Sequence, residues 1–516
     1  MTLPDHGMRP ARGPWTVLGL AWGVLFLLMA CFSIATPPGA SPDEPAHAMR
    51  AYAAAHGQLI GPDSTTVTGT MDLQVSRYFA KLESHMPCFK RAVTVTPACV
   101  APISDPNATT TGHSSTNINT PVFYVAVGWP SLVLQGAKAL YGMRLVSALI
   151  CSGLLALAFV ALLALPRRRW AALAVATGVT PMVLFLSGTL NPNGMEVAAT
   201  TAVFALLCVT FGTPSTRRLL VWRVAGIVVV SVLLVNIRSI AILWLLLALV
   251  SALLLGHPAR IRDVLRSWIT WAAVAVIGLV TVATAFFYLR PRSLTPAYQP
   301  IGAGGSWSQG FSNTLDQTFG FMTGWIAQFG WLEIPAPGIA LAVWACIGSG
   351  IVLVGAALGP RPVRLAALIV GLAVILVPPI TQAALIYSSG YVWQGRYTLA
   401  VGVLLVVICG IGLDRAALPG PDEDRRAATV ARVAIVLLGV GEIGAFLWML
   451  RRYVTGLAPN LTWLDLLRAP QWQPPGGWAL VAVVFVAVTA AGVVLLWRDL
   501  TPAALRTARS QAVVRE

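Results

Sequence analysis

Twelve apolar segments of membrane-spanning length constrain the fold of this chain more than any other feature. Each is about 20 residues long, which is the length an α-helix needs to cross the hydrocarbon core of a bilayer. They lie near residues 15–35, 143–165, 170–188, 193–212, 219–236, 239–256, 268–288, 338–358, 363–387, 395–413, 432–452 and 478–497. Apolar residues make up 57% of the 516 residues and charged residues only 10%, more than a soluble core could bury. The sequence therefore predicts an all-α, polytopic integral membrane protein with about 12 transmembrane helices.

A further apolar segment, residues 121–141, leaves the number of crossings open between 12 and 13. It is interrupted by Pro130 and Gly136, and it carries Lys138. If it does not cross, the basic connections all fall on one side together with both termini, as the positive-inside rule requires. These connections contain Arg167–Arg169, Arg217 and Arg218, Arg260, Arg262 and Arg266, Arg361 and Arg364, and Arg415 to Arg432. We therefore expect 12 crossings, with both termini in the cytoplasm.

The positive-inside rule also explains the net charge of +16. Most of the basic residues lie in these short connections, where membrane topology accounts for them, so we expect no nucleic-acid partner. The opposite side receives the longer connections, which are rich in Gly, Pro and aromatic residues. Function is therefore expected on that extracytoplasmic face.

The segment "ATPPGASPDEPAHAMRAY", residues 35–52, concentrates charge directly after the first apolar segment. One interpretation is a helix start, with Ser41 as N-cap and Glu44 as the reciprocal residue of a capping box. The other is a reaction centre, because Asp43, His47 and Arg50 fall at i, i+4 and i+7 on one helix face. Such a polar stripe beside the membrane suits a hydrophilic ligand that carries a phosphate. The two interpretations are compatible, since a capped helix holds its acids rigidly.

Two of the seven cysteines lie in the large polar loop, residues 36–120. Cys88 and Cys99 flank "FKRAVTVTPA", and in an oxidising compartment we expect them to form a disulfide that closes a hairpin. The alternative is a pair of free thiols.

Five short motifs carry a resemblance to a known family. They are "PDEPAH" (42–47), "NTPVFYVAVGWP" (119–130), "MRLVSAL" (143–149), "FGWLE" (329–333) and "WQGRYTL" (393–399). An acidic motif just after the first transmembrane helix resembles that of the lipid-carrier-dependent glycosyltransferases of the GT-C class. More closely, the chain resembles the bacterial membrane proteins grouped as domain of unknown function 2142. It departs from that pattern in having Glu333 where an Asp is expected and a single proline, Pro121, where a pair is usual.

The resemblance implies transfer of a sugar from a polyprenyl-phosphate donor to a cell-envelope glycan or lipid acceptor, in the bacterial plasma membrane. Asp43 would be the general base, with Glu44 as its alternative or its orienting partner. Candidate substrate-binding residues are His47, Arg50, Arg144, Arg238, Trp331, Glu333, Trp393, Arg396 and Tyr397. Arg396 is the first candidate for the lipid phosphate, because a guanidinium binds phosphate as a rigid fork. A divalent cation held by Asp43 and Glu333 is possible, and a metal-free site fits the sequence equally well.

This interpretation gives the domain organisation. A cytoplasmic N-terminus (1–14) precedes a GT-C-like transmembrane catalytic module (15–413), which includes extracytoplasmic loops 36–120, with short helices, and 291–336. A cytoplasmic loop (414–431), C-terminal transmembrane helices (432–497) and a cytoplasmic tail (498–516) follow. The alternative function is a transporter or flippase for lipid-linked saccharides, and a third is a non-catalytic scaffold. Convergence of Asp43, Arg396 and Glu333 on one outward-facing site is the geometry that the enzymatic interpretation requires.

Overall fold

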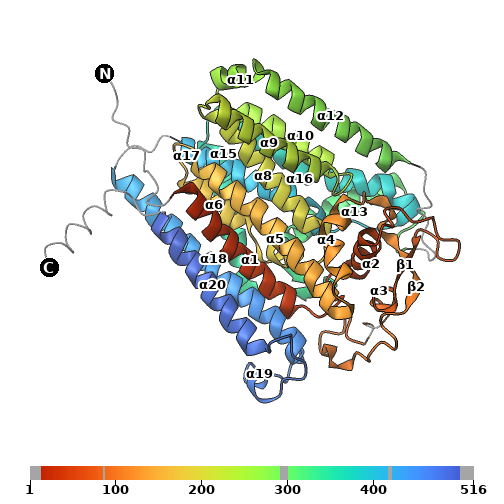
Figure 1. Cartoon of the computed structure of the whole chain (residues 1–516). Helices are drawn as coiled ribbons and strands as arrows, with labels where there is room; N and C mark the ends of the chain where they lie inside the picture. Colours follow the sequence, from red (N-terminus) through yellow and green to blue (C-terminus); the bar gives the residue numbers. More distant parts are fainter. Residues whose placement is uncertain (1–12, 85, 87, 291–299, 417–420, 500–516) are drawn as a thin grey trace, which may run out of the picture.

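The computed structural model describes residues 13–84, 86, 88–290, 300–416 and 421–499. Within these residues, long helices run side by side, and a mixed region built mainly from the first loop covers one end of them (Figure 1). Nearly all of the expected N-terminal segment 1–14 lies outside the described residues. So do most of the tail 498–516 and parts of the expected loops 291–336 and 414–431.

Ten helices among the described residues are long and apolar enough to span a membrane. They are α1 (Pro14–Ala35), α5 (Gly136–Leu163), α8 (Pro192–Gly212), α9 (Arg217–Val235), α12 (Trp268–Leu289), α15 (Gly338–Leu358), α16 (Arg361–Ser389), α17 (Leu399–Arg415), α18 (Pro421–Val454) and α20 (Trp478–Asp499). Of these, α8 lies at the centre, because its whole apolar stretch is buried against other helices. The chain is thus an all-α membrane protein, as predicted.

The two other predicted segments are helical but less regular. Residues 170–188 form α6 (Arg169–Gly178) and α7 (Pro181–Gly188), which meet at an angle of 58°. The break occurs because Thr180 caps α7 and Pro181, at its first position, cannot continue the preceding helix. Counting this pair as one span gives up to 11 spans among the described residues. The twelfth predicted segment, α10 (Ala241–Leu255), has only 15 residues.

Segment 121–141 does not form a transmembrane helix of its own. It is divided into α4 (Val122–Gly128), a 3-10 turn at Trp129–Leu132 and the first residues of α5. Pro130 lies in the turn and Gly136 begins α5, so the two interruptions seen in the sequence are the points where the helix breaks. The segment is therefore shorter than the helices of spanning length, and that it adds no crossing stays a prediction.

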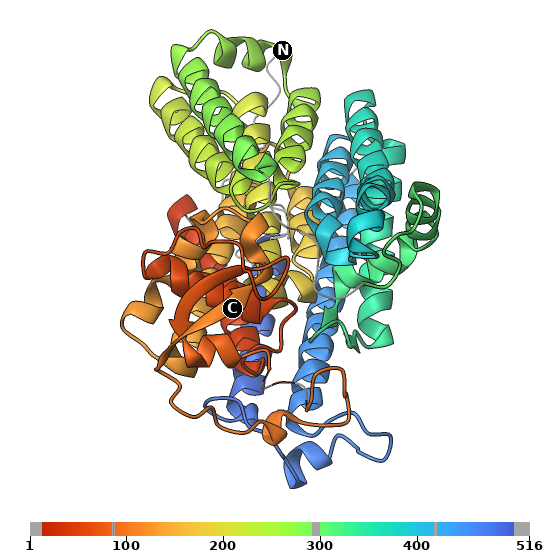
Figure 2. The same ribbon diagram turned by 90° about the vertical axis from the view of Figure 1, so that its right-hand side faces the viewer.

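The first loop contains more than the short helices expected of it. It forms α2 (Glu44–Ala55) and α3 (Arg77–Lys81), but also an antiparallel ribbon of β1 (Met71–Ser76) and β2 (Thr109–Ser114). Figure 2 shows these elements, in red and orange, gathered on one side of the molecule. The ribbon was missed although "MDLQV" alternates apolar and polar residues, with Met71, Leu73 and Val75 buried.

The connections expected outside the cell meet one another at one end of the bundle. The first loop is hydrogen-bonded to four of them, through Ser41 with Thr189 (2.9 Å), Thr120 with the Asn236 carbonyl (2.5 Å), Gly39 with Trp331 (3.1 Å) and Thr96 with Gln471 (3.1 Å). At the other end, Arg169 pairs with Asp424 at 2.7 Å. The contacts thus join the predicted external connections at one end of the bundle and two of the predicted basic connections at the other. That the basic group faces the cytoplasm remains a prediction of the positive-inside rule.

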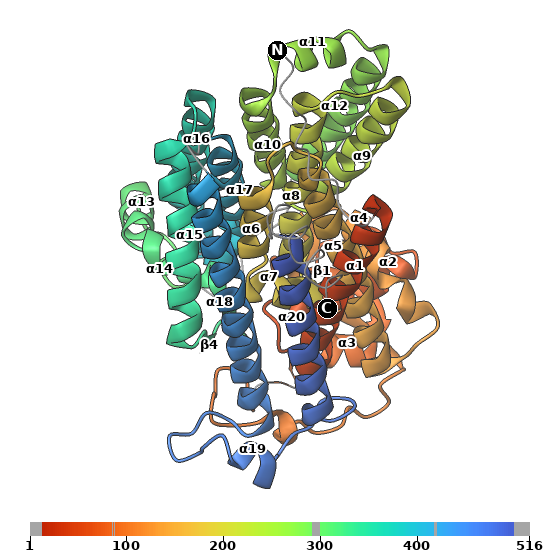
Figure 3. The same ribbon diagram turned by 90° about the vertical axis from the view of Figure 1, so that its left-hand side faces the viewer.

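Shorter elements complete the described chain. They are α11 (Pro258–Leu265), α13 (Trp307–Asp316), α14 (Thr318–Ile326), α19 (Asp465–Arg468), the strand pair β3 (Gln328–Phe329) and β4 (Ile334–Pro335), and 3-10 turns at Pro97–Cys99, Ser115–Ile118 and Gly395–Thr398. In Figure 3, α18 and α20 run next to each other and α19 lies in their connection.

Candidate functional site

The acidic pair Asp43–Glu44 lies where α2 begins, but not in the predicted capping box. The helix starts at Glu44, and Asp43 is its N-cap in a left-handed conformation (φ 59°, ψ 2°) without a side-chain cap. Ser41 instead bonds Thr189. The capping-box prediction is therefore wrong, because the left-handed Asp43 separates Ser41 from the helix. Asp tolerates this conformation at an energetic cost of about 1–3 kcal/mol, a kind of strain found mainly at functional sites.

Glu44 and Arg144 form a fully buried ion pair. Arg144 donates from Nε and Nη2 to the two Glu44 oxygens, at 2.7 and 2.5 Å. The same oxygens accept the backbone N–H groups of Leu190 and Gly39, each at 3.0 Å. Arg144 also donates to three carbonyls, those of Ser33 (2.8 Å), Thr36 (2.6 Å) and Pro37 (2.9 Å). With every donor of Arg144 engaged, the pair fixes the backbone between α1 and α2. The structure therefore gives Glu44 and Arg144 a structural role in place of the expected catalytic and phosphate-binding ones.

Asp43 pairs with Arg396, a residue 353 positions away in the chain. The Arg396 side chain is 1% exposed, whereas the Asp43 carboxylate is 47% exposed. Only Nη2 of Arg396 is engaged, by Asp43 and by the hydroxyl of Tyr397, while Nε and Nη1 are buried without a hydrogen-bond partner in the described chain. Buried unpaired donors on a charged group are costly, so these N–H groups are free for an anionic ligand.

Arg238 also lies close to the Tyr397 ring. Its guanidinium carbon is 4.4 Å from the centre of the Tyr397 ring, and that of Arg396 is 5.3 Å from the same ring. Arg238 also lies 3.5 Å from Glu196 of α8, and its Nη1 makes no well-aligned hydrogen bond. Two guanidinium groups thus share one aromatic ring beside the Asp43 carboxylate.

The charges around Asp43 set its protonation state. Burial alone would raise the pKa of Asp43, but the positive charges of Arg396 and Arg238 and the nearby His47 lower it below its ordinary value. Burial lowers the pKa of His47 to about 4, and both arginines favour the same neutral form. The site therefore presents an ionised carboxylate next to a neutral imidazole.

Arg50 does not extend the stripe that the sequence predicted. It is buried, with Nη1 2.8 Å from the Met71 sulfur and Nη2 donating to the Leu59 carbonyl. These contacts hold α2 against the β1 region, so Arg50 has a structural role. Only Asp43 and His47 of the predicted stripe interact.

The loop before α17 contributes two further unpaired polar atoms. Nε1 of Trp393 and Oε1 of Gln394 are buried without hydrogen-bond partners in the described residues. This loop is held by Gln382 of α16, whose side-chain oxygen accepts the N–H groups of Val392 and Trp393, each at 2.9 Å. Gln382 and Glu196 were missed in the sequence. An acid inside an apolar segment was the available signal for Glu196.

Trp331 and Glu333 lie in a neighbouring cluster, not at the Asp43–Arg396 pair. Trp331 donates to the Gly39 carbonyl at 3.1 Å, and the ammonium of Lys90 covers its ring at 3.4 Å. Burial raises the pKa of Glu333, whose charged neighbours are Arg452 and Arg91. Glu333 therefore does not converge with Asp43 as predicted, and one face of Trp331 is already covered.

A divalent cation shared by Asp43 and Glu333 finds no support in these positions. Asp43 is neutralised by an arginine, and Glu333 faces a different set of basic side chains. Among the described residues there is no group of three or more His, Cys, Asp and Glu side chains arranged to hold a metal ion.

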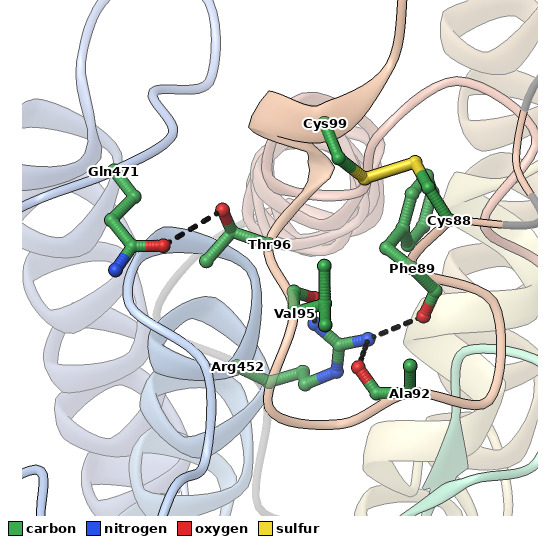
Figure 4. Close-up of a disulfide and its surroundings, with 8 residues drawn as sticks. All are labelled: Cys88, Phe89, Ala92, Val95, Thr96, Cys99, Arg452 and Gln471. Atoms are coloured by element: carbon green, nitrogen blue, oxygen red, sulfur yellow. Dashed lines mark hydrogen bonds between the residues drawn. A yellow bond between two sulfur atoms is a disulfide. The ribbon is translucent and has the colours of Figure 1, made fainter.

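The Cys88–Cys99 disulfide closes a loop around an arginine from α18 (Figure 4). Arg452 is fully buried and donates to the carbonyls of Val95 (2.7 Å), Phe89 (2.8 Å) and Ala92 (3.1 Å). Three carbonyl oxygens of this loop thus bind one guanidinium, which connects the first loop to the C-terminal helices.

Comparisons with known proteins agree with a membrane fold. No curated protein matches the chain. Among solved structures, the crystal structure of ArnT from Cupriavidus metallidurans bound to undecaprenyl phosphate matches with 15% identity and a TM-score of 0.44. The match covers 94% of this chain and 77% of that chain. The profile described as "Predicted membrane protein (DUF2142)" matches residues 26–405, well over half of the sequence, so the chain belongs to that family.

Proposed function

We propose that this protein is a glycosyltransferase that moves a sugar from a polyprenyl-phosphate donor to a cell-envelope glycan or lipid acceptor. The observation that carries the proposal is the state of Arg396. It is a buried guanidinium with one nitrogen on the half-exposed Asp43 carboxylate and two nitrogens without partners. A single arginine thus connects a potential base to a potential anion site.

The residues support the chemistry as follows. The acceptor hydroxyl forms a bond from its oxygen to the anomeric carbon of the sugar, and its proton passes to Asp43. The bond between that carbon and the phosphate oxygen breaks, and its electron pair leaves with the polyprenyl phosphate. The free Nε–H and Nη1–H of Arg396 bind the phosphate as its charge develops, with Arg238 adding a second positive charge.

The low pKa of Asp43 limits its strength as a base. Positioning must then supply much of the rate, and the built-in rigidity of this carboxylate suits that role. The Glu44–Arg144 pair fixes the next residue of the chain, and Arg396 holds the carboxylate itself. The rigid backbone and the bound guanidinium together leave Asp43 little freedom.

The external loops are proposed to face the extracytoplasmic side of the bacterial plasma membrane, because the basic connections gather at the other end. Cysteine substitution tests this in intact cells with a membrane-impermeant thiol reagent. Ser104→Cys, in the exposed part of the first loop, should be labelled, whereas Arg260→Cys on α11 should be labelled only after lysis. The reverse pattern would place the site on the wrong side of the membrane for transfer to a cell-envelope glycan or lipid.

The decisive variant is Asp43→Asn, with Asp105→Asn as its matched control. Asp105 also has a left-handed backbone (φ 43°), lies in the same loop and pairs with an arginine. Its side chain is 81% exposed, however, and its partner Arg77 is not a residue of the site. Asn tolerates the same backbone conformation, so both changes remove a charge without straining the chain. In a deletion strain, envelope glycans measured by mass spectrometry should be restored by Asp105→Asn and not by Asp43→Asn.

Binding of polyprenyl phosphate to the purified protein separates the alternatives. Asp43→Asn should still bind the lipid in native mass spectrometry. Arg396→Lys should lose the bidentate hydrogen bonds from Nε–H and Nη1–H to the phosphate and bind at least about ten-fold more weakly. Arg77→Lys, in the exposed pair with Asp105, is the control for the second change. Unchanged glycans with Asp43→Asn would favour a flippase. Unchanged glycans and lipid binding in both site variants would favour a scaffold.

A further inference from the structure

A hydrogen-bond chain behind the site ends on His47. The side-chain nitrogen Nδ2 of Asn119 donates to the Tyr124 hydroxyl at 2.9 Å, and that hydroxyl lies 2.9 Å from Nδ1 of His47. All three side chains are buried, and the His47 and Tyr124 rings are stacked at 5.9 Å. Tyr124 comes from α4, so the broken segment 121–141 supplies part of the site.

The direction of this chain favours one tautomer of His47. A phenolic oxygen that accepts from Asn119 keeps its own proton available for Nδ1 of the imidazole. Burial raises the pKa of Tyr124 to about 12, so the phenol remains protonated and can donate. A ring nitrogen that accepts a hydrogen bond in a neutral imidazole leaves the proton on the other nitrogen, Nε2.

His47 lies one helical turn after Asp43, and its backbone N–H donates to the Asp43 carbonyl at 3.1 Å. With Nδ1 occupied by Tyr124, Nε2 is the ring nitrogen left for other partners. We propose that Asn119 and Tyr124 hold His47 as the Nε2–H tautomer, which makes it a hydrogen-bond donor that positions the Asp43 carboxylate. In this arrangement His47 is a positioning residue and cannot act as a second base. Its effect on sugar transfer rests on the proposed function, whereas the tautomer itself does not.

The charged surroundings favour the neutral ring. The groups that face His47 are Asp43 at the start of α2, Arg396 before α17, Arg238 before α10 and the phenol of Tyr124 from α4. Two positive charges and burial outweigh the single carboxylate, so the pKa of about 4 keeps the ring neutral at ordinary pH. Above about pH 4, a neutral His47 can therefore donate from Nε2 to an ionised Asp43.

The test is ¹⁵N nuclear magnetic resonance of histidine-labelled protein in detergent, with His47→Gln used to assign the signal. From about pH 5 to about pH 8, wild-type His47 should show an unprotonated Nδ1 and a protonated Nε2. Asn119→Asp places an acceptor where the donor was, so the Tyr124 proton turns away and His47 should gain a proton on Nδ1. Because Asp is nearly isosteric with Asn, this variant should fold.

Tyr52→Phe is the matched control. Tyr52 is stacked on His56 of the same helix at 4.1 Å, but the Nδ1 of His56 bonds the Tyr52 backbone carbonyl, not the hydroxyl. This variant should leave the His47 signal unchanged. A protonated Nδ1 in the wild-type protein, or an unchanged tautomer in Asn119→Asp, would overturn the proposal.

Envelope glycans separate this inference from the proposed function. Asn119→Asp should lower transferred sugar at least about ten-fold while polyprenyl phosphate still binds, because it changes the positioning of Asp43 and not the Arg396 fork. If the tautomer behaves as expected but neither Asp43→Asn nor Asn119→Asp changes any glycan, the proposed function fails and the tautomer assignment stands. If Asn119→Asp changes the tautomer and only Asp43→Asn abolishes transfer, the positioning role is refuted.

Discussion

Replacing Arg144 with methionine should destabilise the protein more than any other single loss of an ion pair at a described residue. Met keeps much of the side-chain volume but leaves the Glu44 carboxylate fully buried with only two backbone N–H donors. Breaking a buried pair on one side typically costs about 3–5 kcal/mol. The carbonyls of Ser33, Thr36 and Pro37 also lose their donor, which adds about 1 kcal/mol for each. The expected loss of unfolding free energy is therefore about 6–8 kcal/mol.

Arg169→Met provides a matched control at the opposite end of the bundle. Arg169 bonds the Asp424 carboxylate with comparable geometry, but the Asp424 side chain is 48% exposed and remains hydrated when its partner is lost. Loss of such an exposed pair costs about 0–1 kcal/mol. Both variants remove the same charge and insert the same side chain, so the difference between them comes from burial and from the three carbonyls that Arg144 binds.

Apparent melting temperatures, followed by tryptophan fluorescence in one detergent at one scan rate, provide the measurement. A fixed scan rate is needed because large chains often unfold irreversibly. The double variant Arg144→Met with Glu44→Gln should recover part of the loss, since it removes the stranded charge. Equal melting temperatures for Arg144→Met and Arg169→Met, or strictly additive effects in the double variant, would refute the reasoning.

Three further predictions follow from local geometry. Replacing Cys88 and Cys99 by serine should cost about 2–3 kcal/mol, as expected for a short closed loop, and a reductant should lower the melting temperature of the wild type but not of the double variant. Gly395→Ala should lower both the melting temperature and polyprenyl-phosphate binding, because the new Cβ would lie 2.0 Å from the Phe321 carbonyl oxygen. The control Gly444→Ala places its Cβ in open space, so it should change neither the melting temperature nor the binding. The raised pKa of Glu333 means that the folded protein holds this proton more tightly than the unfolded chain, so stability should fall as pH rises from about 4.5 through the folded pKa. Glu333→Gln should remove that decline, and an identical pH dependence in both proteins would contradict it.

The spanning helices were predictable because lipid imposes a length and a polarity that the local sequence must satisfy. The division of segment 121–141 followed the interruptions at Pro130 and Gly136. The β1–β2 ribbon was less accessible, since its strands are more than thirty residues apart in a polar loop and only one of them alternates clearly. Local patterns identify elements well, but not pairings that depend on a distant partner.

The site was predictable in chemistry and only partly in geometry. Arginine and carboxylate are the residue types that a phosphate and a base require, and the structure brings Asp43 and Arg396 together across the whole fold. The sequence could not show that all N–H groups of Arg144 would donate to Glu44 and three carbonyls. Burial decides whether an arginine binds a ligand or the protein itself. Glu333 was misplaced for the same reason, since its cluster with Arg452 joins segments that are distant in sequence.

The hydrogen bonds between Arg452 and the carbonyls of the Cys88–Cys99 loop set an order for assembly. The carbonyl partners of Arg452 at Val95, Ala92 and Phe89 precede it by 357 to 363 residues. At ordinary rates of synthesis, the ribosome needs roughly 20–70 s to reach the arginine after it has made these partners. During that interval the Cys88–Cys99 loop lacks the guanidinium that binds its carbonyl oxygens. A chain that stops before α18 would therefore leave these carbonyls without their donor.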